Sequence, residues 1–121
     1  MAKIALPLSI LSSLLLMLLL NSGGNSKFAH AEAPENKWCV AKPSSSNAEL
    51  QNNIDYACQH VNCNIIEPGQ RCYDPNTPSN HASVIMNLYY KTKGQQPINC
   101  NFRNSAVIVQ TDPSYDDCKY A

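Results

Sequence analysis

Cysteine content constrains this chain more than any other feature. All six cysteines lie in the last 83 of its 121 residues, at positions 39, 58, 63, 72, 100 and 118. An even number of cysteines in a short exported chain is typical of a disulfide framework, here three bridges. Spacing alone leaves all fifteen possible pairings open. A zinc site is not expected, because no C-x-x-C pair is present and the three histidines are scattered, so no metal or other cofactor is predicted.

The N-terminus predicts that the chain is exported. Lys3 precedes an apolar stretch over residues 4–20, and Ala29-His30-Ala31 fits the A-x-A cleavage rule. We place the cut after Ala31, with Ala31-Glu32-Ala33 as a second candidate. The alternative, a membrane anchor, is disfavoured because the stretch is short for a span and contains Pro7 and serines.

The expected organisation is a signal peptide over residues 1–31, a lead-in over 32–36 and one module over 37–121. Cleavage leaves 90 residues with seven basic and nine acidic side chains, a net charge of −2 with histidine neutral. No basic cluster is present, so nucleic acid and anionic membranes are not expected partners. The C-terminus has no hydrophobic tail of the glycolipid-anchor type. We expect a secreted, extracellular monomer without a membrane anchor.

Two helices are predicted. Ser46 and Glu49 form a capping-box pattern, and an apolar face follows, which predicts a helix over 47–59. A second helix is expected from Ser79 or Asn80. It would end in the lysines that precede Gly94, a natural residue after a helix C-terminus.

The remaining chain contains turns and short extended pieces. Residues 106–109, Ala-Val-Ile-Val, predict a strand, and residues 71–73 predict a short extended piece. Turn signals such as Pro68-Gly69 and Asp74-Pro75 lie between the helices. The expected fold is a small disulfide-rich α+β domain with two helices packed on a short antiparallel sheet and with long loops.

No catalytic residue is predicted. A glycosidase needs two carboxylates on opposite sides of a cleft, whereas Glu49 is expected to cap a helix and Asp112 lies in a turn before proline. A cysteine nucleophile would need a free thiol, and no nucleophile-elbow motif appears. The chain is therefore not expected to be an enzyme.

Aromatic side chains indicate binding instead. Flat rings stack on the C–H faces of sugars, and amides hydrogen-bond to hydroxyls. Tyr73, Tyr90 and Tyr115 are expected to face solvent, whereas Tyr56 and Tyr89 lie on or beside apolar helical faces and are expected in the core. Exposed aromatics mark many kinds of interaction site, so this pattern alone does not establish glycan binding.

Several spaced motifs carry a resemblance to a known family. They are Trp38-Cys39-Val40-Ala41, Asp55-Tyr56-Ala57-Cys58, Cys72-Tyr73, Pro75-Asn76-Thr77, His81-Ala82-Ser83, Asn87-Leu88-Tyr89-Tyr90, Cys100-Asn101-Phe102 and Asp112-Pro113-Ser114 before Cys118. Over residues 37–120 the chain resembles carbohydrate-binding module family 43, the plant X-eight domain. The resemblance implies binding of β-1,3-glucan, such as callose or laminarin, in the plant cell wall. It also implies the pairings Cys39–Cys100, Cys58–Cys63 and Cys72–Cys118.

The candidate glucan contacts are Tyr73, Asn76, His81, Asn87 and Tyr90. The chain departs from the family pattern at Asn101, Asn104 and Asp116, the last two at positions where glycine is usual; asparagine tolerates a left-handed backbone better than most residues. A disulfide-rich structural or defence protein without glycan binding is the alternative.

Overall fold

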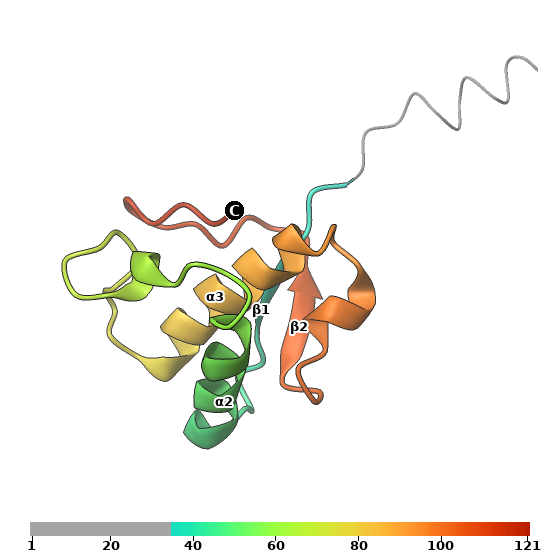
Figure 1. Ribbon diagram of the computed structural model, residues 1–121. Helices are drawn as coiled ribbons and strands as arrows, with labels where there is room; N and C mark the ends of the chain where they lie inside the picture. The colour runs from blue at the N-terminus through green and yellow to red at the C-terminus, as the bar shows by residue number, and fades with distance from the viewer. Residues whose placement is uncertain (1–34) are drawn as a thin grey trace, which may run out of the picture. The chain divides into compact units, whose positions relative to one another are not determined.

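Two short strands and two α-helices form the body of the domain. The computed structural model describes residues 35–121; the predicted signal peptide and residues 32–34 of the lead-in lie outside this range. The elements, in chain order, are β1 Trp38–Ala41, α2 Asn47–Ala57, the 3-10 helix η1 Asn64–Ile66, α3 Pro78–Thr92, the 3-10 helix η2 Pro97–Cys100 and β2 Ala106–Val109. Figure 1 shows β1 between α3 and β2, with α2 packed beside α3. The predicted α+β class is confirmed.

The sheet consists of β1 and β2, paired antiparallel with Trp38 opposite Val109 and Ala41 opposite Ala106. β2 occupies the residues that its β-branched run predicts, whereas β1 is an element that the sequence reasoning missed. β1 is held on its other edge by α3, because the backbone N–H groups of Cys39 and Ala41 donate to the side chains of Asn87 and Ser83. The side-chain oxygens of α3 thus accept the hydrogen bonds that a third strand would accept at this edge of the sheet.

α2 begins as predicted. Ser46 accepts a hydrogen bond from the Glu49 backbone N–H at 3.1 Å, and the Glu49 carboxylate accepts from the Ser46 N–H at 3.0 Å. This reciprocal pair satisfies two of the N–H groups that a helix start leaves unpaired. The helix ends at Ala57, two residues before the predicted end.

α3 begins earlier than predicted, at Pro78 rather than Ser79 or Asn80. Thr77 accepts from the Asn80 N–H, and proline suits the first helical position because its missing N–H would be unpaired there. Gly94 follows the helix with φ of +77°, as its expected role requires. Residues 71–72 are a turn rather than part of an extended piece, so that prediction is wrong.

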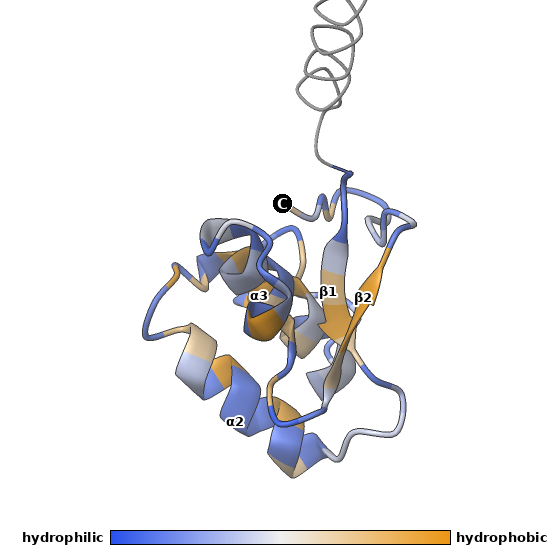
Figure 2. Cartoon of the chain, turned by 90° about the vertical axis from the view of Figure 1, so that its right-hand side faces the viewer, coloured by the Kyte–Doolittle hydropathy of each residue, from blue (hydrophilic) through white to orange (hydrophobic). Residues whose placement is uncertain are grey.

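The core surrounds α3, the most deeply buried helix. One cluster joins α3 to β1, β2 and α2 through residues such as Leu50, Met86 and Tyr90. The other joins a different face of α3, with Ile85 and Tyr89, to Cys72 and Cys118. Figure 2 shows hydrophobic colouring along β2 and mostly hydrophilic colouring on α2. Within residues 35–121, no helix is both long enough and apolar enough to cross a membrane.

Three disulfides join these elements: Cys39–Cys100, Cys58–Cys63 and Cys72–Cys118. They are the pairings that the resemblance implied. Two of them close long segments, with sequence separations of 61 and 46 residues, and the third closes a local turn after α2. The long bridges fix β1 to the end of η2 and the turn before α3 to the C-terminal segment.

Candidate functional site

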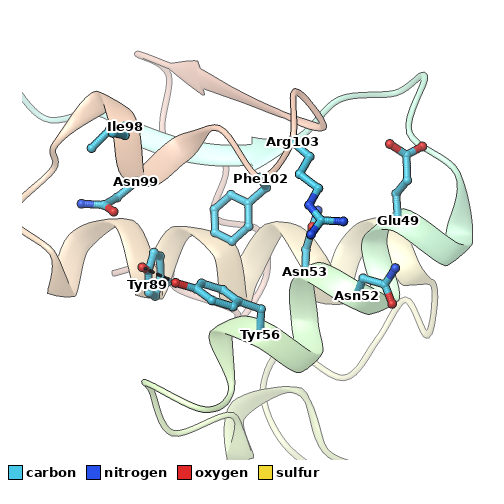
Figure 3. Close-up of a pocket in the computed structure, with 9 residues that line it drawn as sticks. All are labelled: Glu49, Asn52, Asn53, Tyr56, Tyr89, Ile98, Asn99, Phe102 and Arg103. Carbon is cyan, nitrogen blue, oxygen red and sulfur yellow. Dashed lines mark hydrogen bonds between the residues drawn. The ribbon is translucent and has the colours of Figure 1, made fainter.

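A hollow of about 470 Å³ opens between α2, α3, η2 and the turn that precedes β2. We call it the aromatic pocket. Its lining residues are Glu49, Asn52, Asn53, Tyr56, Tyr89, Ile98, Asn99, Phe102 and Arg103. Figure 3 shows the three rings at its centre, Ile98 and Asn99 on one side, and Arg103, Asn52 and Glu49 on the other. The pocket therefore combines an apolar centre with polar sides.

The three aromatic rings of the pocket support one another. The Tyr89 ring meets Tyr56 and Phe102 edge to face, with ring centroids 5.6 Å apart in both pairs. The Tyr56 and Tyr89 hydroxyl oxygens lie 3.3 Å apart, a hydrogen bond that Figure 3 marks. Tyr89 is buried, but Tyr56 is 48% exposed. Tyr89 thus holds the Tyr56 ring in place, while part of the Tyr56 surface remains open to solvent.

The position of Tyr56 on α2 explains its exposure. Successive helix residues are separated by about 100° around the axis, so Tyr56 lies about 200° from Ile54, which is in the core. The expectation that Tyr56 belongs to the core is therefore wrong. Tyr89, on the buried face of α3, is in the core as expected, with its edge at the pocket.

Two ionisable groups of the pocket have shifted pKa values. Hydrogen bonding to Tyr56, followed by burial, raises the pKa of the Tyr89 phenol, so this ring stays neutral. Hydrogen bonds with Ser46 lower the pKa of the Glu49 carboxyl, so that this group stays ionised. Lys93 lies 5.6 Å from the Tyr89 ring centroid. A neutral phenol and an ionised carboxylate can both hydrogen-bond to hydroxyl groups.

The wall opposite α2 is a turn with unusual backbone geometry. Phe102, Arg103 and Asn104 have φ angles of 48°, 54° and 65°, in the left-handed region. Asn104 thus adopts the conformation that its tolerance for this region allows. Asp116, the other residue at a usual glycine position, has φ of 46°.

Three of the predicted contact residues lie together on a second surface. The rings of Tyr73 and His81 are 5.5 Å apart, and His81 Nε2 lies 2.6 Å from the Tyr73 carbonyl oxygen. Asn76 is exposed in the turn between them, and both rings are half-buried. Tyr115 joins this region through a hydrogen bond from its hydroxyl to the Asp74 carbonyl oxygen.

The other two predicted contact residues are buried. Tyr90 is 1% exposed and Asn87 is 0% exposed, so the expectation that Tyr90 faces solvent is wrong. Tyr90 lies on the face of α3 that packs in the first core cluster, and Asn87 hydrogen-bonds to β1. Neither side chain presents a surface to a ligand.

Two of the pocket residues that the sequence reasoning missed carry recognisable signals. Tyr56 lies off the apolar face of its helix, and Phe102 follows a disulfide-bonded cysteine by two residues. Ile98, 82% exposed, follows Pro97 in η2 and has no sequence pattern that predicts its position. The pocket combines residues from three distant segments, and such a combination is visible only in the folded chain.

Among the lining residues of the aromatic pocket the only carboxylate is Glu49, whereas acid–base hydrolysis of a glycosidic bond uses two. Within residues 35–121, no three His, Cys, Asp or Glu side chains are grouped as a metal site would require.

Comparison with known proteins gives a family match. A family model, the X8 domain, matches residues 37–107. The chain is 45% identical over 84 residues to a glucan endo-1,3-beta-glucosidase of Triticum aestivum, covering 69% of this chain and 18% of that protein. It is 40% identical over 86 residues to the major pollen allergen Ole e 10 of Olea europaea, covering 69% of this chain and 70% of the allergen.

A third relative is plasmodesmata callose-binding protein 1 of Arabidopsis thaliana. It is 35% identical over 105 residues, which are 86% of this chain and 48% of that protein. Four related glucan endo-1,3-beta-glucosidases are much longer, and the chain spans no more than 20% of the length of each.

Proposed function

Because this chain belongs to the X8 domain family, we propose that it binds β-1,3-glucan in the aromatic pocket and catalyses no reaction. The observation that carries the proposal is the half-exposed Tyr56 ring, which packs on Tyr89 and lies among polar side chains of the pocket. The names of its relatives, which include a callose-binding protein and glucan endo-1,3-beta-glucosidases, support this ligand class.

The Tyr56 ring supplies the stacking surface. A glucose unit presents C–H groups on its faces, and burying them against an aromatic ring removes apolar area from water. Since the rings of Tyr89 and His60 already pack against the Tyr56 ring, little side-chain freedom is lost when a sugar stacks on it. The exposed Ile98 adds a second apolar contact on the other side of the pocket.

The polar sides of the pocket supply hydrogen bonds to hydroxyls. Asn52 and Asn99 each offer an amide donor and acceptor, Arg103 offers guanidinium donors, and Glu49 offers an ionised acceptor. Such mixed donors and acceptors suit a neutral polyhydroxylated chain. Because the site is open and must displace water from hydroxyls, we expect micromolar or weaker affinity for short oligosaccharides.

The state of the Glu49 carboxylate supports the proposal that the chain catalyses no reaction. Glu49 accepts the Ser46 N–H and has a lowered pKa, so it cannot hold the proton that a general acid must donate at neutral pH. The chain also spans no more than a fifth of the glucosidases it resembles, so their activity is not assigned to it.

We place this function outside the cell. Three disulfides are typical of proteins that fold in an oxidising compartment, and the N-terminal residues 1–31 have the pattern of a secretion signal. The proposed location is the cell wall, where the module over 37–121 would bind glucan as a monomer.

The Tyr73 surface, formed by Tyr73, Asn76 and His81, is the competing location for the ligand. The aromatic pocket is favoured because Tyr56 is more exposed than the half-buried Tyr73, whose ring already faces His81. Asn76 and His81 would contact only a glucan long enough to extend from the aromatic pocket to the Tyr73 surface.

The test is retention on insoluble polysaccharide. The chain is produced with its own N-terminus in a eukaryotic secretory host and incubated with curdlan, a β-1,3-glucan, or with cellulose, a β-1,4-glucan. We expect retention on curdlan but not on cellulose. Equal retention on both, or retention on neither, would contradict the proposal and favour a structural or defence role.

A further inference from the structure

The turn that forms one wall of the aromatic pocket is energetically costly. Phe102, Arg103 and Asn104 are consecutive, none is glycine, and all have positive φ angles. A left-handed backbone costs roughly 1–2 kcal/mol for each such residue, and it occurs as single residues rather than runs. Three in succession therefore require support from the surrounding structure.

Ser105, which follows the turn, supplies much of this support. Its backbone N–H donates to the carbonyl oxygens of Asn101 and Phe102, and its hydroxyl donates to the Phe102 carbonyl oxygen. Its own carbonyl oxygen accepts from the Lys42 N–H at 2.9 Å and from the Ser45 hydroxyl at 3.0 Å. Every polar atom of this buried residue is thus used to hold the turn.

Two asparagines complete the support. Asn53 Nδ2, on α2, donates to the Ser105 hydroxyl oxygen at 2.7 Å, and the Asn53 side chain is buried. Asn101 Oδ1 accepts from the Asn104 backbone N–H at 2.7 Å. Because Asn53 and Tyr56 are on the same helix, the Asn53–Ser105 bond fixes the turn relative to the exposed ring across the pocket.

We propose that Asn53, Asn101 and Ser105 are positioning residues that hold Phe102 and Arg103 in place before any ligand arrives. The proposal rests on the proposed glucan binding in the aromatic pocket. A wall formed in advance spares the ligand the cost of ordering it, so affinity depends on these three residues although Asn101 and Ser105 do not line the pocket. The ligand served is a neutral β-1,3-linked oligosaccharide whose hydroxyls meet the Arg103 donors.

The test compares two buried serines that each accept a hydrogen bond. Ser105→Ala removes support for the turn, whereas Ser83→Ala removes the bond from the Ala41 N–H to α3, outside the pocket. Laminarihexaose affinity is measured by calorimetry at a temperature at which both variants are folded. We expect about a tenfold loss, equivalent to about 1.4 kcal/mol, for Ser105→Ala and unchanged affinity for Ser83→Ala. Unchanged affinity in Ser105→Ala, or equal losses in both, overturns the proposal.

A ligand-free measurement separates this inference from the proposed function. The intraresidue HN–Hα NOE is strongest at positive φ, where the two hydrogens lie closest. We expect strong NOEs at residues 102–104 in the unliganded wild type and weaker ones in Ser105→Ala. If the wild type does not bind laminarihexaose, the proposed function fails and these NOEs alone decide the positioning role. NOEs that are unchanged in Ser105→Ala overturn it.

A second variant protects the test against a folding defect. Asn101→Ala removes the bond to the Asn104 N–H at an exposed position, so the fold is expected to persist. We expect a several-fold loss of affinity together with a weaker intraresidue HN–Hα NOE at Asn104. Wild-type affinity in this variant contradicts the role given to Asn101.

Discussion

Asn87 Oδ1 accepts a hydrogen bond from the Cys39 backbone N–H at 3.0 Å, and Asn87 Nδ2 donates to the Ala121 carbonyl oxygen at 3.1 Å. One fully buried amide on α3 therefore holds the first strand of the domain and the last residue of the chain. The sheet consists of β1 and β2, so the Asn87 side chain accepts a hydrogen bond from β1 that a third strand would otherwise accept. It also explains why Asn87 is unavailable to a ligand.

Asn87→Ala is expected to lower the free energy of unfolding by about 1–3 kcal/mol, because a buried N–H and a carbonyl oxygen lose their partner. Urea denaturation monitored by circular dichroism measures the change. Gln110→Ala, at an exposed position after β2, is the control and should stay within about 0.5 kcal/mol of wild type. Equal midpoints for both variants would show that Asn87 does not hold the strand.

Tyr56→Ala should weaken laminarihexaose binding by about tenfold, or about 1.4 kcal/mol, through loss of the stacking ring. Tyr56→Phe keeps the ring and should bind within about twofold of wild type, since the lost hydroxyl contacts Tyr89 at 3.3 Å inside the aromatic cluster. Tyr73→Ala is the matched control on the Tyr73 surface and should bind normally. A larger loss of affinity in Tyr73→Ala than in Tyr56→Ala would show that the glucan binds at the Tyr73 surface instead.

The disulfides should differ in their contribution to stability. Replacing Cys39 and Cys100 together by alanine removes a bridge between residues 61 apart in the sequence. The chain-entropy model predicts that the free energy of unfolding then falls by about 4 kcal/mol. Replacing Cys58 and Cys63 together removes a bridge between residues only 5 apart and should lower the free energy of unfolding by about 2 kcal/mol. Denaturant midpoints of the two double variants provide the comparison. A larger loss of stability in the Cys58 and Cys63 variant would show that native contacts around Cys58, rather than loop closure, determine the contribution of the bridges.

Stability should fall at alkaline pH through Tyr120. Burial, with a smaller contribution from Tyr115, raises the pKa of Tyr120 to about 12, above its ordinary value of 10.0. The folded state therefore favours the neutral phenol. Its contribution is complete below pH 10 and is lost as pH rises toward 12, because the unfolded chain releases this proton first. Urea midpoints at pH 9 and pH 11 should differ less in Tyr120→Phe than in wild type. An identical decline in both would refute this assignment.

Local patterns predicted the elements that local interactions determine. The capping box at Ser46 and Glu49, the positive φ of Gly94 and the strand Ala106–Val109 were all predicted, since each depends on residues close in the sequence. The strand β1 was missed because it is formed by contacts with β2 and with α3 side chains, more than 40 residues away in each case.

The binding residues were harder to predict for the same reason. Tyr90 and Asn87 are polar enough to suggest a surface, yet they lie on the face of α3 that packs against β1 and β2. Tyr56 was assigned to the core although its position around α2 turns it outward. The pocket depends on the way the Cys39–Cys100 bridge and Ser105 bring residues 98–103 against α2, and no local pattern encodes that approach.

The most direct test of the proposed glucan binding is a titration of the ¹⁵N-labelled, oxidised chain with laminarihexaose, followed by the amide chemical shifts. We expect the shifts that move to be grouped around the aromatic pocket, at Tyr56, Tyr89 and residues 98–103. Movement confined to Tyr73, Asn76 and His81, or no movement at millimolar oligosaccharide, would contradict it.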